Sequence, residues 1–248
     1  MLIRSAKFLL ILCTTYCCGV SHAETDESKD HSVATAPLIK KIGPQLYQIG
    51  IISFNQTTRE IYIPAETNIT DPGSIIEYLL VHSNGEKIHE SLLTTAADPT
   101  HINIALKLLN YRESKELFRL RDERGFFTDQ YPIVADEIKK AARVEILITW
   151  KDQVVEKTIP VTDWIYNQAT QRNMISMPWI YNGSFIHEKA FNAKLTGSII
   201  TIYPNIGAIA NYSGDDRSDD SLWTPSKNTP PEGTSVKVTL KPWTPVPQ

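Results

Sequence analysis

The chain has 248 residues, with 25 lysines and arginines against 28 aspartates and glutamates, which gives a formal net charge of −3. This balance lacks the basic excess by which proteins bind nucleic acids, so we expect no nucleic-acid partner. A chain of this length can bury a substantial hydrophobic core, in one large β-rich domain or in two small ones.

The first 23 residues predict a signal peptide. Arg4 and Lys7 precede an apolar run at residues 8–12, and small residues precede a cleavage point after Ala23. We therefore expect an exported protein, periplasmic or extracellular, with no transmembrane segment once the signal is cleaved. An uncleaved anchor is the weaker alternative, because a membrane span needs about 20 predominantly apolar residues and polar residues soon follow this run.

All the cysteines of the chain, Cys13, Cys17 and Cys18, lie inside this predicted signal peptide. The mature chain is therefore expected to be free of cysteine, which excludes disulfides, thiol catalysis, iron–sulfur clusters and cysteine-rich zinc sites. Lipid anchoring at Cys17 or Cys18 is a minor alternative, because a lipidated cysteine follows a small residue, whereas Tyr16 precedes Cys17.

The remaining chain predicts one folded domain with short extensions. Residues 24–38 are small and charged, which indicates a disordered lead-in. Residues 39–243 predict a single β-rich domain, and residues 244–248 form a tail. At the start of the domain, residues 47–54 and 59–64 are rich in strand-forming residues and flank a four-residue turn, so we expect a hairpin.

A second hairpin is expected between residues 75–82 and 87–95. These segments flank Asn84-Gly85, and Asn-Gly is the strongest two-residue hairpin signal because both residues tolerate positive φ. The two strands would run antiparallel, with Tyr78 opposite Ser91.

Asp98-Pro99 predicts the start of a helix, because Asp98 can accept hydrogen bonds from free amides and proline suits the first turn. Apolar residues then recur at helical spacing, so a helix near residues 99–110 should pack on a sheet. Residues 112–142 predict a surface excursion that ends in a short helix at residues 135–142. Further strands are expected at residues 143–150, 154–161, 179–185, 195–203 and 235–241.

Strands far outnumber helices in this prediction. We therefore expect an α+β, β-rich fold, with antiparallel sheets in a sandwich-like arrangement and at least one packed helix. Residues 211–233 are rich in aspartate and proline and predict a loop. We interpret the Asn-X-Ser/Thr sequences as turns; they begin at Asn55, Asn68, Asn182 and Asn211.

Several motifs follow one another in a characteristic order. They are Ile88-His89-Glu90-Ser91-Leu92-Leu93, residues 143–150 (RVEILITW), Asp163-Trp164, residues 178–184 (PWIYNGS) and residues 230–236 (PPEGTSV). Together they resemble the YdjY-type domain, a family of exported bacterial proteins, over roughly residues 47–241. Residues 112–142 are longer than the family pattern, so nothing is carried over there. The resemblance implies an exported domain and implies no reaction; some members are associated with ferredoxin-like cysteine motifs, which this chain lacks.

The histidines are candidate metal ligands. His82, His89 and His101, together with Glu90, offer the imidazole and carboxylate donors that suit zinc or another divalent ion. In the expected hairpin, His82 and His89 share one sheet face, whereas Glu90 points to the other, so His89 and Glu90 would not clamp one metal. The structural alternative is that His89 and Ser91 hydrogen-bond within the fold and that Glu90 is a partnered carboxylate.

Two other clusters could bind a ligand. Aromatic residues suggest a carbohydrate platform formed by Trp164, Trp179, Tyr181 and Trp223, whereas Trp150 lies on an apolar strand face and is expected in the core. The acidic cluster Asp215, Asp216, Asp219 and Asp220 lacks the spacing and the glycine of a calcium loop, so we interpret Asp215–Asp220 as a solvated loop, with calcium binding as the alternative.

The sequence contains no serine elbow, phosphate loop or recognisable pair of catalytic carboxylates. The leading hypothesis is an exported, non-enzymatic binding or interaction module for an unknown protein or carbohydrate, with no cofactor. A metal-dependent hydrolase that uses His82, His89 and His101 is one alternative. An envelope-associated structural protein is the other.

Overall fold

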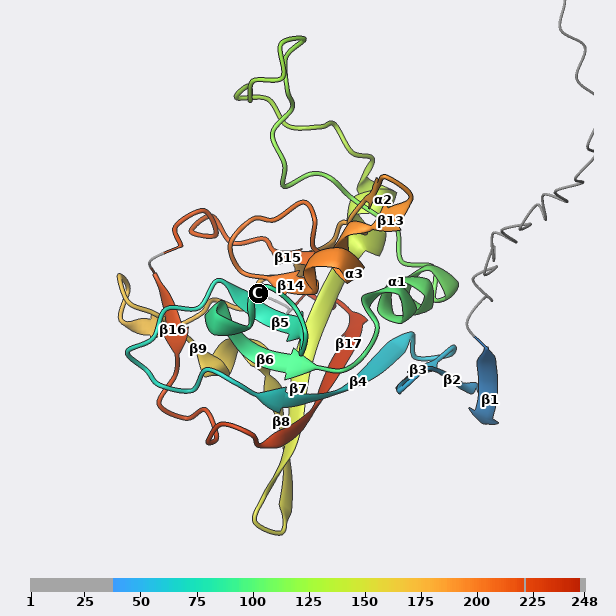
Figure 1. Cartoon of the computed structure of the whole chain (residues 1–248), viewed down its shortest axis with the longest axis vertical. Coiled ribbons are helices and arrows are strands. Elements are labelled where there is room, and N and C mark those ends of the chain that lie inside the picture. Colours follow the sequence, from blue (N-terminus) through green and yellow to red (C-terminus); the bar gives the residue numbers. More distant parts are fainter. Residues whose placement is uncertain (1–37, 221, 246–248) are drawn as a thin grey trace, which may run out of the picture. The chain divides into compact units, whose positions relative to one another are not determined.

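The computed structural model describes residues 38–220 and 222–245 (Figure 1). The predicted signal peptide with Cys17 and Cys18, the lead-in up to residue 37 and the last residues of the tail lie outside the described residues. No helix within the described ranges is long and apolar enough to cross a membrane.

The helices of the described chain are short and its strands dominate. The helices are α1 (Pro99–Leu108), α2 (Asp136–Ala142), α3 (Asn192–Thr196) and the 3-10 helices η1 (Ile88–Glu90) and η2 (Val161–Trp164). The strands are β1 (Ile39–Gly43), β2 (Leu46–Ile49), β3 (Ile52–Asn55), β4 (Glu60–Thr67), β5 (Tyr78–His82), β6 (Ser91–Thr95), β7 (Arg143–Asp152), β8 (Val155–Pro160), β9 (Ile165–Asn167), β10 (Arg172–Asn173), β11 (Trp179–Tyr181), β12 (Ile186–His187), β13 (Ala190–Phe191), β14 (Ser198–Thr201), β15 (Ala210–Tyr212), β16 (Trp223–Pro225) and β17 (Ser235–Pro242).

Eight strands of the described chain close into a barrel. Each is hydrogen-bonded to the next in the order β4, β17, β7, β11, β15, β14, β5 and β6, and β6 pairs with β4 to complete the circle. The β14–β15 and β5–β6 pairs are parallel, and the other neighbours are antiparallel. The β-rich class was predicted correctly, but the sandwich-like arrangement of antiparallel sheets is wrong, because the pairing of β6 with β4 closes one sheet on itself.

Additional strands branch from this barrel. β3, β2 and β1 follow β4 as antiparallel neighbours, and β8 pairs with β7. β3 and β4 form the first predicted hairpin, in which Asn55 Oδ1 accepts hydrogen bonds from the amides of Thr57 and Thr58 at 2.8 and 3.1 Å. The predicted first strand is divided at Gly50, whose φ of +57° turns the chain between β2 and β3.

The prediction of a second, antiparallel hairpin is wrong: β5 and β6 are neighbours and Tyr78 does lie beside Ser91, but the two strands run parallel, with His82 beside Thr95. The turn at Gly85 instead packs against Gly197, since a Cβ on Gly85 would lie 3.1 Å from the Gly197 Cα. The His82 amide donates to the Gly197 carbonyl at 2.8 Å, so the end of β5 is bonded to the chain before β14. η1 then returns the chain to the start of β5, where β6 begins.

α1 begins as predicted and packs on the core. Asp98 Oδ1 accepts a hydrogen bond from the Thr100 amide at 2.8 Å, which caps the helix. The apolar stripe predicted from the spacing is buried, and it includes Ile102, Ala105 and Leu106.

Candidate functional site

A groove with a volume of about 790 Å³ lies between residues 115–132 and two segments, 203–206 and 215–218, on either side of β15. In Figure 1, residues 115–132 belong to the green loop that projects beyond α2, and α2 itself confirms the helix predicted at residues 135–142. We call this cavity the basic groove. Its lining consists of Lys115, Leu117, Phe118, Arg119, Leu120, Arg121, Phe127, Tyr131, Pro132, Tyr203, Pro204, Ile206, Asp215, Arg217 and Ser218.

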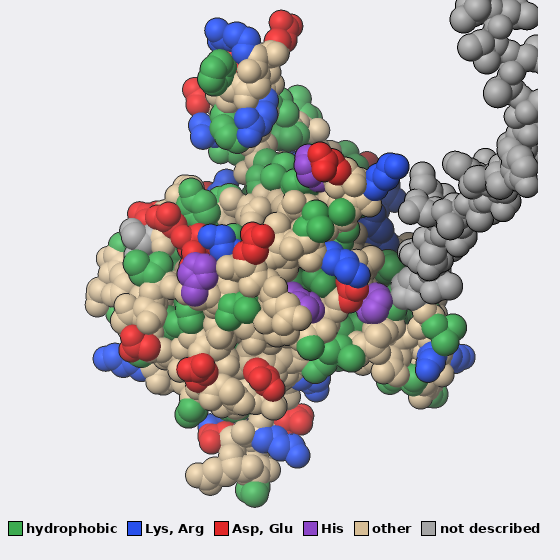
Figure 2. Space-filling view, viewed as in Figure 1, with side chains coloured by type: hydrophobic (Ala, Val, Ile, Leu, Met, Phe, Trp, Pro, Cys, Tyr) green, Lys and Arg blue, Asp and Glu red, His purple; other side chains and the backbone are tan. Residues whose placement is uncertain are grey.

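The charged residues of this lining are mostly cationic. Lys115, Arg119, Arg121 and Arg217 face a single lining carboxylate, that of Asp215. Figure 2 shows basic and hydrophobic side chains together on the projecting segment, with acidic ones among them. Four cationic side chains against one carboxylate make the lining positive, in contrast to the net charge of −3 of the whole chain, so the basic groove would attract anionic ligands.

The first wall of the basic groove is a short hairpin within the projecting segment. The Thr128 amide donates to the Leu120 carbonyl at 2.8 Å. Asp122 Oδ1 closes the turn by accepting hydrogen bonds from the amides of Arg124 and Phe126, each at 2.9 Å. These bonds, above all the one from Phe126, lower the pKa of Asp122, so its carboxylate holds the turn in the ionised form.

Two guanidinium groups of this hairpin stack on one aromatic ring. The Cζ atoms of Arg121 and Arg119 lie 3.9 and 5.5 Å from the centre of the Phe127 ring. Arg121 Nη1 also donates to the Gly125 carbonyl at 2.6 Å. A guanidinium carries five N–H donors, so a stacked arginine held by one internal hydrogen bond keeps donors for a ligand.

The second wall of the basic groove consists of residues 203–206 and 215–218. Two buried side chains hold its backbone in place. Asn182 Nδ2 donates to the carbonyls of Ile206 and Ala208 at 3.0 and 2.8 Å. Ser184 Oγ donates to the Gly207 carbonyl at 2.5 Å. Both side chains are buried, so these bonds fix the backbone of the wall without competition from water.

Asn211 completes this network. Its Nδ2 donates to Asn182 Oδ1 at 2.7 Å, and its Oδ1 accepts from the Asn205 amide at 2.7 Å and from Thr201 Oγ1 at 2.8 Å. Asn211 lies in β15 and Asn182 directly follows β11, so the interpretation of these two residues as turns is wrong. They are core residues whose amides satisfy one another and the loop between β14 and β15.

Lys115 connects the first wall to the same buried segment. Its Nζ donates to the carbonyls of Asn182 and Ser184 at 2.5 and 3.0 Å. Burial lowers the pKa of Lys115. Residues 182–184 therefore bond to both walls, by side chains on one side and by carbonyls on the other, and set the distance between them.

The histidines predicted as metal ligands have separate surroundings. His82 Nδ1 accepts a hydrogen bond from the Asn84 amide at 3.1 Å, whereas His101 packs against Gly50. The side chain of His89 is 70% exposed. In the part of the chain that the structure describes, no three or more His, Cys, Asp or Glu side chains are grouped to hold a metal ion.

His89 and Glu90 lie in η1 rather than in a strand, so the predicted placement of these two side chains on opposite sheet faces is wrong. His89 Nε2 is 2.8 Å from Glu90 Oε1, and Lys87 Nζ donates to both carboxylate oxygens of Glu90 at 3.2 and 3.3 Å. Burial and then the neighbouring Glu90 raise the pKa of Glu77. The Ser91 side chain is buried, and its Oγ donates to a backbone carbonyl at 2.8 Å, as in the structural alternative.

The aromatic residues predicted as a sugar-binding platform lie in the core. Trp164, Trp179, Tyr181 and Trp223 are all fully buried. Tyr181 Oη donates to a side-chain oxygen of the core-facing helix α1 at 2.6 Å. These rings belong to the hydrophobic core and would reach a ligand only if the core opened, so the prediction of an exposed aromatic platform is wrong.

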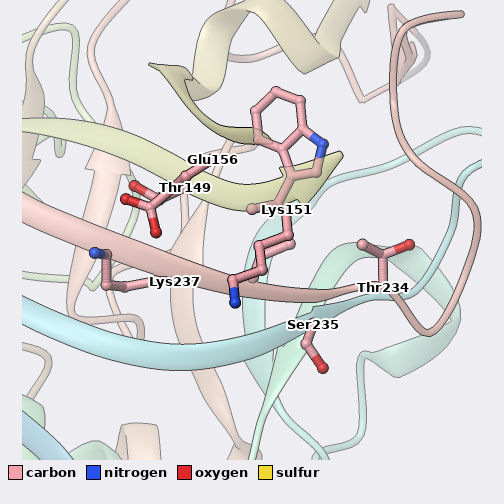
Figure 3. Close-up of a pocket in the computed structure, with 8 residues that line it drawn as sticks. Thr149, Lys151, Glu156, Thr234, Ser235 and Lys237 are labelled. Carbon is pink, nitrogen blue, oxygen red and sulfur yellow. The ribbon is translucent and has the colours of Figure 1, made fainter. Parts of the chain in front are cut away.

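Trp150, expected in the core, packs against it with its ring centre 4.8 Å from that of Trp164, but it is only partly buried and lines a second cavity of about 460 Å³. Figure 3 shows the polar residues around it, which come from β17 and the chain before it and from the β7–β8 hairpin. They include Lys151, Glu156 and Lys237. This cavity is smaller than the basic groove, and it has two cationic side chains to one carboxylate, whereas the basic groove has four to one.

The acidic segment at residues 215–220 includes a structural carboxylate, Asp216, and a groove-lining one, Asp215. Asp216 Oδ2 accepts a hydrogen bond from Asn167 Nδ2 at 2.9 Å. Asp215 lines the basic groove. The segment is thus tied to β9 on one side and contributes to the groove on the other.

Comparison with protein families matches residues 52–241 to the YdjY domain. The matched range extends from β3 into β17 and includes both walls of the basic groove. No curated protein and no solved structure matches the chain.

Proposed function

We propose that this chain, which belongs to the YdjY domain family, is an exported, non-enzymatic binding module whose ligand occupies the basic groove. The observation that carries the proposal is the gathering of Lys115, Arg119, Arg121 and Arg217 in one cavity of about 790 Å³ with aromatic rings. Cavities of this volume enclose small organic ligands or a few units of a polymer. Guanidinium groups and rings supply the polar and apolar contacts that such ligands need.

The fixed walls of the basic groove support binding. The stack of Arg119 and Arg121 on Phe127 orders the first wall, and the buried side chains of Asn182 and Asn211 order the loop of the second. A site that is already ordered loses less conformational entropy when a ligand binds, so more of the contact energy appears as affinity.

The binding proposal can be tested by NMR titration of the purified mature protein with phenol, benzoate and phenyl phosphate. We expect backbone shift changes to concentrate in residues 115–132 and 203–218, and Tyr131→Ala to reduce them. Tyr166→Ala, which changes a partly exposed tyrosine outside the groove, is the matched control. Shift changes that cluster around Trp150, or no response to any of the three probes, would overturn the assignment of the groove.

The export part of the proposal rests on the sequence pattern of residues 1–23 and has its own test. The full chain is expressed in a bacterial host, the cells are fractionated, and the intact mass of the protein is measured. A periplasmic protein that begins at Glu24 is the expected result. A protein that retains Met1, or one that begins at a lipidated Cys17 or Cys18, would contradict cleavage after Ala23.

A further inference from the structure

We infer that the ligand of the basic groove is an acidic carbohydrate, an oligosaccharide whose sugar rings carry carboxylates. This inference rests on the proposed function, because it names the ligand class of the same groove. Three features of the lining carry it: the arginines, the exposed rings and the polar groups beside them.

The arginines match carboxylates that are repeated along a chain. Arg119 and Arg121 present guanidinium groups from the hairpin, and Arg217 presents a third from the facing segment. Arg217 Nη1 donates to the Gly214 carbonyl at 2.9 Å, which positions its guanidinium as the Phe127 ring positions the other two. Planar guanidinium groups bind carboxylates through two parallel hydrogen bonds, and a uronic-acid oligosaccharide offers one carboxylate per sugar.

The exposed rings match the apolar faces of sugars. Phe127, Tyr131 and Tyr203 keep 57%, 46% and 36% of their surface exposed although all three line the groove. The C–H face of a pyranose ring packs on such a flat surface, and tyrosine adds a hydroxyl that can bond to the sugar.

The remaining polar groups favour a sugar over an acidic peptide. The Asp215 carboxylate and the Ser218 hydroxyl lie in the same lining. A carboxylate accepts hydrogen bonds only, so Asp215 suits the many hydroxyl donors of a sugar. Asp215 repels the carboxylates of an acidic peptide and of an acidic sugar alike, but only the sugar brings many hydroxyl donors that can offset this repulsion.

Calorimetric titration of the mature protein with trigalacturonate tests the inference. We expect binding that weakens as sodium chloride is raised, and much weaker binding of the fully methyl-esterified trisaccharide, which keeps the sugar rings and removes the charges. Arg121→Gln should weaken trigalacturonate binding about 10-fold or more, as expected for the loss of a charge-assisted contact. The affinity of Arg121→Lys for trigalacturonate should lie between those of the unmodified protein and Arg121→Gln. Arg172→Gln changes an exposed arginine outside the groove and should keep the affinity within about twofold of that of the unmodified protein.

Other outcomes of these titrations would overturn the inference. Equal binding of the methyl ester, or no binding of trigalacturonate, overturns the acidic-carbohydrate ligand. Tight binding of tetraglutamate without binding of trigalacturonate overturns it in favour of an acidic peptide. In all these cases the proposed function still stands if benzoate and phenyl phosphate shift residues 115–132 and 203–218 in the NMR titration, and it fails together with the inference only if no probe reaches the groove.

Discussion

Replacing Asn211 by alanine should remove the centre of the polar network beneath the basic groove. The Asn211 side chain makes four hydrogen bonds, and two of its partners, Asn182 Oδ1 and Thr201 Oγ1, belong to fully buried residues. Without Asn211 both partners lose that bond in the interior. A buried polar group left without its partner costs about 1–3 kcal/mol, so the two together predict a loss of about 2–6 kcal/mol in the free energy of unfolding.

Urea denaturation followed by tryptophan fluorescence measures this loss, because Trp164, Trp179 and Trp223 are fully buried in the folded protein. The matched control is Asn173→Ala. Asn173 is exposed, and its Nδ2 donates to the Asp163 carbonyl at 3.2 Å, so its removal should cost less than about 1 kcal/mol.

A double-mutant cycle separates the network from simple loss of volume. If Asn182 and Asn211 act as a pair, the Asn182→Ala, Asn211→Ala double variant should lose less stability than the sum of the two single variants, by about 0.5–3 kcal/mol. An Asn211→Ala cost as small as that of the Asn173 control, or strict additivity in the cycle, would refute the argument that this pair holds the wall.

Three further predictions concern other parts of the described chain. Gly197→Ala should destabilise the protein by more than about 2 kcal/mol in urea, because Gly197 has a φ of +76° and the new Cβ would lie 2.5 Å from a backbone carbon; an unchanged midpoint would contradict this. Burial raises the pKa of Asp98, but hydrogen bonds from Lys194 and Thr100 outweigh it and lower the pKa below the usual value. Asp98→Ala should therefore cost about 1 kcal/mol at neutral pH and progressively less as the pH falls through the lowered pKa, and a difference that does not depend on pH would argue against this pairing. His89→Ala should change stability by less than about 0.5 kcal/mol, since the side chain is mostly exposed, and should leave the metal content of the purified protein unchanged in elemental analysis; loss of bound zinc would support the metal hypothesis instead.

The sequence predicted correctly those features that depend on residues close together in the chain. Asp98 caps α1 as predicted, because the cap and the helix are neighbours in the chain. The Asn84-Gly85 signal was misleading, because the packing of Gly85 against Gly197 decides the path of the chain, and a contact between segments so far apart leaves no local pattern.

The candidate site could not be predicted from the sequence for a similar reason. A tryptophan such as Trp179 or Trp223 contributes the same to the composition whether it is buried or exposed, and contacts between distant segments of the chain decide which it is. The basic groove did leave a trace, since arginines at 119 and 121 and phenylalanines at 126 and 127 flank an Asp-containing turn at Gly125. Only the folded hairpin shows that one of those rings stacks under both guanidinium groups.

The closure of the barrel also dictates when the protein can finish folding. β17 lies between β4 and β7, so Ile61 near the start of the described chain pairs with Leu240 near its end. Contacts between such distant segments form slowly, because a long loop must close before they contribute. Until β17 has been synthesised, β4 and β7 each present an unpaired edge, and such edges invite pairing with other chains. A nascent chain of this protein is therefore expected to depend on chaperones until its last strand is available.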